Sequence, residues 1–73
     1  MDVWVVMEYT DCGDFYVNSV WSDENEARKA AKHRIEVECG KDYTYRQIDD
    51  NTWEAEGGIY GVSVEVVQRY LRH

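Results

Sequence analysis

The sequence predicts an α+β domain, in which an antiparallel sheet carries one helix on one face, in the order β-β-α-β-β-β. Three observations lead to this class. Short segments of alternating apolar residues, separated by turn residues, occupy both ends of the chain. One segment between them has a helix cap at its start and a glycine after its end. Hairpins on both sides of a helix favour a largely antiparallel sheet. The length of 73 residues predicts a single domain, residues 1–73.

The first two elements are predicted to be strands that form a hairpin. The first strand, "DVWVVMEYT" over residues 2–10, is apolar on both sides until Glu8, which is typical of an interior strand covered on both faces. The turn "DCGD" over 11–14 contains Gly13, flanked by turn-favouring Asp residues. The second strand is "FYVNSVW" over 15–21. Strict alternation predicts that one face of it carries Phe15, Val17, Ser19 and Trp21.

A helix is predicted over residues 23–39. Ser22 or Asp23 is the expected N-cap, and acidic residues in the first turn suit the positive end of the helix dipole. Gly40 is a natural residue just after the C-terminal end. The small side chains of the expected buried stripe let the helix lie close on a sheet. That stripe comprises Ala27, Ala30, Ala31 and Ile35, with Val37 at its margin.

Three more strands are predicted after the helix. Segments 43–48 and 53–56 flank the turn "DDNT", and the last strand is expected over 59–67. A helix also fits residues 63–71, because Val64, Val67 and Leu71 keep helical spacing. The β-branched content of this segment favours the strand.

Charge and aromatic content both bear on function. Fifteen Asp and Glu against eight Lys and Arg give a net charge of −7. Such a field repels phosphate backbones, so direct nucleic-acid binding is disfavoured and attraction to basic surfaces is favoured. Solubility alone is the alternative reason for the acids. Three Trp, six Tyr and one Phe exceed what one helix can cover. We therefore expect the other sheet face to be partly aromatic and exposed, unless a partner or second subunit covers it.

Cysteine use and hydropathy predict a cytoplasmic protein with no membrane association. Cys12 and Cys39 are too few for a disulfide framework, so both are expected to be free thiols, with a single bridge as the alternative. The chain start lacks the pattern of a signal peptide. The longest apolar run, Val3 to Met7, is far shorter than a membrane span.

Neither a metal site nor a catalytic site is predicted. The candidate ligands Cys12, Cys39, His33 and His73 do not have zinc-site spacing. A nucleophilic pair of Cys12 and His33 would need a third, orienting group and a substrate pocket. No phosphate-binding glycine motif and no nucleophile-elbow motif is present. We expect no enzyme activity and no cofactor.

The segments "VWVVMEY" and "VWSDENEARKAA" carry a resemblance. In a short, proline-free, acidic chain rich in Trp and Tyr, they resemble the small proteins of bacteriophages and mobile elements, among them anti-CRISPR and other anti-defence inhibitors. The second segment looks like the strand-to-helix junction of small prokaryotic domains of unknown function. It is also similar to the N-terminal half of HicB-type antitoxins, whose glycine-rich strand turn and pocket residues are absent here. The resemblance implies inhibition by protein–protein contact and assigns no residues.

The function predicted from these features is a non-catalytic protein-binding module. It would dock an acidic and aromatic surface on a basic, nucleic-acid-binding protein and inhibit it. The alternative is a homo-oligomer, such as a homodimer, that assembles through the aromatic sheet face or an edge strand. The predicted partner-binding residues are the acids Asp11, Asp14, Asp49, Asp50, Glu54 and Glu56 and the aromatic residues Tyr16, Tyr45 and Trp53.

Overall fold

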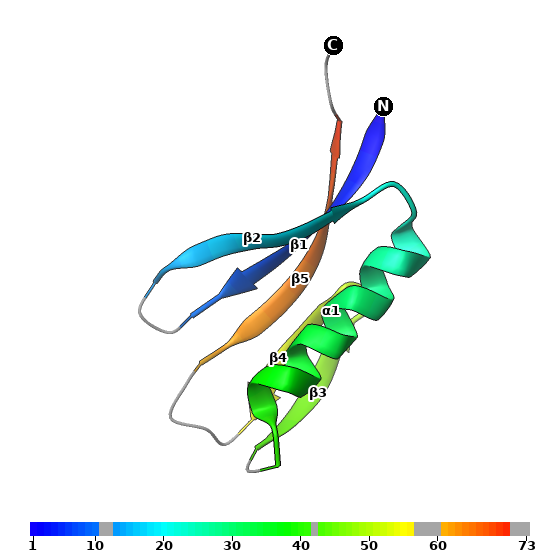
Figure 1. Cartoon of the computed structure of the whole chain (residues 1–73). Helices are drawn as coiled ribbons and strands as arrows, with labels where there is room; N and C mark the ends of the chain where they lie inside the picture. Colours follow the sequence, from blue (N-terminus) through cyan, green and yellow to red (C-terminus); the bar gives the residue numbers. More distant parts are fainter. Residues whose placement is uncertain (11–12, 42, 57–60, 71–73) are drawn as a thin grey trace.

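A computed structural model describes residues 1–10, 13–41, 43–56 and 61–70, and it confirms the α+β class and the predicted element order (Figure 1). The elements are β1 (Asp2–Tyr9), β2 (Phe15–Trp21), α1 (Glu24–Cys39), β3 (Thr44–Asp49), β4 (Thr52–Glu56) and β5 (Ser63–Tyr70). The five strands form one sheet in the order β2-β1-β5-β4-β3, with every neighbouring pair antiparallel. The helix α1 lies across one face of this sheet.

The C-terminal strand β5 joins the two hairpins into one sheet. It pairs with β1 from Asp2↔Tyr70 to Tyr9↔Ser63 and with β4 from Thr52↔Glu65 to Glu54↔Ser63. The predicted last strand therefore exists, but it begins at Ser63 and continues to Tyr70. The helical alternative for this segment is wrong for residues 63–70, and residues 59, 60 and 71 lie outside the described part.

The helix α1 has both predicted caps. The Asp23 side chain accepts a hydrogen bond from the Asn25 backbone N–H at 3.0 Å, and the Gly40 N–H donates to the Glu36 carbonyl at 2.9 Å. Its buried stripe keeps a spacing of four residues, at Ala27, Ala31, Ile35 and Cys39. The placement of Val37 at the margin of the stripe is wrong. Val37 is 54% exposed, because two residues after Ile35 the helix has turned to its outer side.

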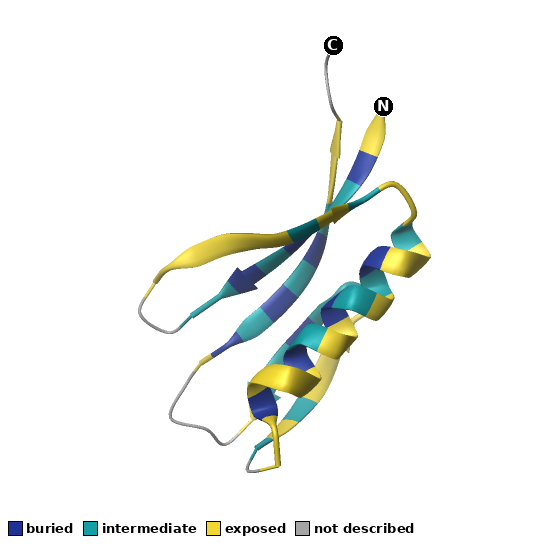
Figure 2. Ribbon diagram, in the orientation of Figure 1, coloured by how far each residue is buried: buried dark blue, intermediate teal, exposed yellow. Residues whose placement is uncertain are grey.

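The hydrophobic core lies between α1 and one sheet face (Figure 2). The strands contribute Val6, Val64, Val66 and Trp53, and α1 contacts all five strands. Trp4 and Trp21 pack against the same cluster. Tyr43 and Tyr45 pack against it as well, so five aromatic residues close the core around a helix whose own buried side chains are mostly small.

A β-bulge in β2 overturns one prediction. Met7 pairs with Val17 and Val6 pairs with Ser19, so Asn18 is an extra residue and the register shifts there. A one-residue shift moves the following side chains to the opposite face. Phe15 and Val17 therefore do not share a face with Ser19 and Trp21, as strict alternation predicted.

The prediction for the first strand is half right. β1 is interior, between β2 and β5, but the described elements cover it on one face only. The side of Val5, Met7 and Tyr9 carries no helix, and these three residues are partly exposed. Among the described residues, a helix therefore covers only one face of the sheet.

Other predictions concern thiols, metals and membranes. Cys39 is a free, buried thiol, as predicted, whereas Cys12 lies outside the described residues. No group of three or more His, Cys, Asp or Glu within residues 1–10, 13–41, 43–56 and 61–70 could hold a metal ion. The described chain contains no helix with the length and hydropathy needed to cross a membrane.

Candidate protein-binding surface

The sheet face opposite α1 carries a continuous group of apolar side chains. We call it the apolar patch; its members are Val5, Met7 and Tyr9 on β1, Phe15, Val17 and Val20 on β2, and Val67 on β5. Strand pairing places them side by side, with Tyr9 opposite Phe15, Met7 opposite Val17, and Val5 opposite both Val20 and Val67. None of the seven belongs to the core cluster under α1.

The most exposed part of the apolar patch is the edge strand β2. Phe15 is 65% exposed, and Val17 and Val20 are each 55% exposed. The rings of Tyr9 and Phe15 lie 6.1 Å apart between centroids at 36°, so they form one aromatic end of the patch. Contiguous exposed apolar residues of this kind mark interaction sites in monomeric proteins.

Charged side chains border the apolar patch on its β5 and β4 side. Glu65 lies opposite Met7, and Glu54 lies on β4 opposite Ser63. Burial raises the pKa of the Tyr9 hydroxyl, and the negative charge of Glu65 and a hydrogen bond to it raise that pKa further. The patch therefore combines an apolar centre with a charged border, in which Arg69 lies opposite Val3 on the face of Glu65 and Arg46 pairs with Glu54. The net charge of −7 makes acid predominate over the chain as a whole, which favours a partner with apolar side chains flanked by basic ones.

The predicted acidic residues do not form one cluster. Asp49 and Asp50 lie at the turn between β3 and β4, where an Asp49 carboxylate oxygen accepts the Asn51 N–H at 2.8 Å. Glu54 and Glu56 share the Arg46 guanidinium, at 4.0 and 3.6 Å. Asp14 is exposed just before β2, and Asp11 lies outside the described residues.

The predicted aromatic residues lie on the α1 side of the sheet. Trp53 is only 4% exposed and packs under α1, so the structure contradicts its role as an exposed contact residue. The Tyr16 hydroxyl donates to Glu8, and the Tyr45 hydroxyl donates to Glu36 at 2.9 Å. Both tyrosines remain partly exposed, although their hydroxyl groups are already paired within the chain.

The sequence interpretation missed the apolar members of β2. It expected an exposed aromatic face, but it assigned no patch residue to it. A signal was present: β2 contains no charged residue in a chain that is 32% charged. The other edge strand, β3, carries Arg46 and Asp49, and charges on an edge protect it from association. The edge strand β2, which has no such charges, is therefore the edge that is not protected from association with another protein.

A buried ion pair between Glu8 on β1 and Arg34 holds α1 on the sheet. The pair lies on the face opposite the apolar patch, and Glu8 is next to Tyr9 in the sequence. Glu8 is 1% exposed, and its carboxylate accepts the Arg34 Nε–H at 2.6 Å and the Tyr16 hydroxyl. Arg34 also pairs with Glu38 in the next turn of α1. The described residues leave no buried side-chain polar atom without a partner. These contacts join β1, β2 and α1.

Alkaline solution is expected to destabilise the fold. The hydrogen bond to Glu8 raises the pKa of Tyr16, and the hydrogen bond to Glu36 raises that of Tyr45. Burial raises the pKa of Tyr9 and of the Cys39 thiol. Above about pH 10 the unfolded tyrosines lose protons that the folded ones keep, so the free energy of unfolding falls as pH rises.

Thermal melts between pH 8 and 11.5 measure this effect. The melting temperature should stay constant as the pH rises toward the ordinary pKa of a cysteine thiol. It should decrease at higher pH, where the thiol and the tyrosines of the unfolded chain lose their protons. Tyr16→Phe should have a shallower decrease than the wild type, because it removes one of the shifted groups. A melting temperature that stays level through pH 11 would contradict the prediction.

Comparison with protein-family models, curated proteins and solved structures finds no match to this chain. The class that the fold and surface define is a small α+β domain with a helix on one side of its sheet and an apolar face with a charged border on the other.

Proposed function

We propose that this chain is a non-catalytic protein-binding module that docks its apolar patch on a basic partner protein. The observation that carries the proposal is the uncovered sheet face, where Phe15, Val17 and Val20 are exposed on β2 and Glu65 lies across β1 on β5. An apolar centre supplies the area removed from water, and charges at the border select the partner and its orientation.

Charge favours a different protein as the partner over a second copy. Each copy carries −7, so two copies repel each other electrostatically. Like charges across an interface disfavour association. A surface with apolar residues flanked by Lys and Arg has the complementary pattern.

The same complementarity supports an inhibitory role. Basic protein surfaces commonly bind phosphate backbones, and a strongly acidic protein attached there would compete with nucleic acid for the same lysines and arginines. The resemblance to small inhibitors of bacteriophages and mobile elements agrees with this role. The proposal is therefore an inhibitor that occupies a nucleic-acid-binding surface in the cytoplasm.

The test compares two double variants that remove exposed apolar side chains without changing charge. The first, Phe15→Ser with Val17→Ser, alters the apolar patch. The second, Ile48→Ser with Val37→Ser, removes two exposed apolar residues that lie outside it. Partners are captured from a bacterial lysate, identified, purified and titrated against each variant. We expect the patch variant to bind at least about 30-fold more weakly, since loss of central contact residues costs about 2 kcal/mol or more.

The control variant should keep wild-type affinity, and binding should weaken with added salt because exposed charges are screened. The captured partner should also have a basic surface and lose nucleic-acid binding when the complex forms. Equal binding by both variants would overturn the patch as the docking surface. Sedimentation analysis tests the alternative: a dimer that the patch variant dissociates would assign this face to self-assembly.

A further inference from the structure

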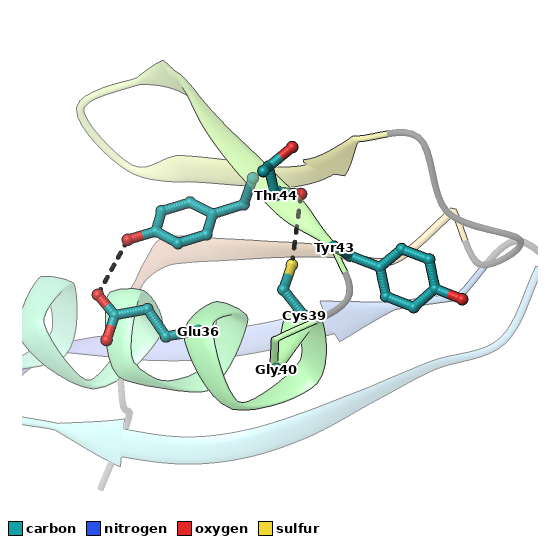
Figure 3. Close-up of a pocket in the computed structure, with 6 residues that line it drawn as sticks. Glu36, Cys39, Gly40, Tyr43 and Thr44 are labelled. Atoms are coloured by element: carbon teal, nitrogen blue, oxygen red, sulfur yellow. Dashed lines mark hydrogen bonds between the residues drawn. The ribbon is translucent and has the colours of Figure 1, made fainter.

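We propose that the cavity between the last turn of α1 and the start of β3 binds an arginine side chain of a partner protein. The cavity has a volume of about 320 Å³. It lies on the α1 side of the sheet, at the β3 edge, and is separate from the apolar patch (Figure 3). The proposed function enters only in naming a protein as the source of the arginine. The residues that line the cavity are Glu36, Cys39, Gly40, Tyr43, Thr44 and Tyr45.

The electrostatics of the cavity favour a cation. Glu36 accepts the Tyr45 hydroxyl at 2.9 Å, and no basic side chain of the described residues forms an ion pair with it. The last turn of α1 contains no basic residue that would compensate the negative end of its dipole, and Lys41 follows only beyond Gly40. Arg34, one turn earlier, is already bonded to Glu8 and Glu38.

The shape of the cavity fits a long side chain with a charged end. Figure 3 shows Glu36 at one end and Tyr43 at the other, with Cys39 and Gly40 between them. The backbone of Gly40 has a φ of 58°, which suits glycine, and the space where a side chain would begin is open. A methylene stem can lie along Cys39 and Tyr43 while the charged group reaches Glu36.

Arginine fits this arrangement better than lysine. A guanidinium is planar, can bond a carboxylate through two N–H groups and can stack on an aromatic ring such as that of Tyr45. The ammonium group of lysine is a compact, strongly hydrated charge that would use the carboxylate alone. The Tyr45 hydroxyl also holds the Glu36 carboxylate in place before the ligand arrives.

The test is a titration of the whole chain, observed by ¹H–¹⁵N NMR, with Nα-acetylarginine amide. We expect saturable shifts of the backbone amides that line the cavity. The citrulline analogue has almost the same shape without the charge, and it should produce no saturable shifts there. Glu36→Gln should weaken arginine binding at least about tenfold, because it removes the charge from the carboxylate–guanidinium hydrogen bonds.

Glu26→Gln is the matched control. It makes the same charge change on an exposed residue in the first turn of α1, and it should leave arginine binding unchanged. No shifts, equal shifts with citrulline, or full binding by Glu36→Gln would overturn the site. Binding of the lysine amide as tight as that of arginine would overturn the preference for a guanidinium.

The test also separates this site from the docking surface. The patch variant Phe15→Ser with Val17→Ser should keep the arginine-induced shifts. If the patch variant keeps the arginine-induced shifts and also captures the partner as well as the wild type does, only the proposed docking surface fails. If partner capture depends on the patch and arginine does not bind, only the cavity assignment fails.

Discussion

Ala31→Glu is expected to unfold the domain. Ala31 is fully buried where α1 packs on the sheet, so the new carboxylate would lie in the core without a partner. Burial of an unpaired charge costs several kcal/mol. A domain of this size has a total stability of about 4–11 kcal/mol. Far-UV circular dichroism and urea titration should show no cooperative transition, or one at a much lower midpoint.

The matched control is His33→Glu on the outer side of the same helix. His33 is exposed, so the substitution adds the same side chain without burying it. Its free energy of unfolding should stay within about 0.5 kcal/mol of the wild type. If Ala31→Glu melted at the wild-type midpoint, the packing of α1 on the sheet described above would be wrong.

Arg34→Ala is expected to destabilise the domain by about 3–5 kcal/mol, because it leaves a buried carboxylate without its cation. Glu8 is 1% exposed and, among the described residues, would keep only the Tyr16 hydroxyl as a partner. Urea titration monitored by tryptophan fluorescence measures the loss, since Trp4 and Trp21 pack at the same interface.

Two further variants separate this effect from the general loss of an arginine. Arg46→Ala removes an exposed arginine with two carboxylate neighbours and should cost no more than about 1 kcal/mol. Adding Glu8→Gln to Arg34→Ala should recover part of the stability, because a neutral amide can still accept the Tyr16 hydrogen bond. If the double variant were as unstable as Arg34→Ala, an orphaned charge could not be the cause.

The site could be predicted only in its general character. Excess aromatic content predicted a sheet face that one helix cannot cover, and the absence of charge in β2 was visible in the sequence. The particular residues could not be assigned, since Trp53 and Phe15 are both aromatic strand residues with acidic neighbours. Trp53 is buried because its side chain lies on the face of β4 that α1 covers, whereas Phe15 is exposed because its side chain lies on the uncovered face of the edge strand β2.

The sequence by itself determined the elements of this protein. Asp23 caps the start of the helix and Gly40 caps its end, through hydrogen bonds to backbone atoms two and four residues away. Turn residues separate the strands. These signals act over a few residues, so they can be read without knowing the fold. The same applies to the stripe of Ala27, Ala30, Ala31 and Ile35, which predicted the buried side of α1; Ala30 is partly buried and the other three are fully buried.

Only the tertiary structure decided how these elements meet. The insertion of β5 between the hairpins pairs Asp2 with Tyr70, near opposite ends of the chain. The bulge at Asn18 reversed the faces of β2, and Glu8 became a buried partner of Arg34, 26 residues away. Each outcome depends on contacts between distant segments, which no local pattern of side chains encodes.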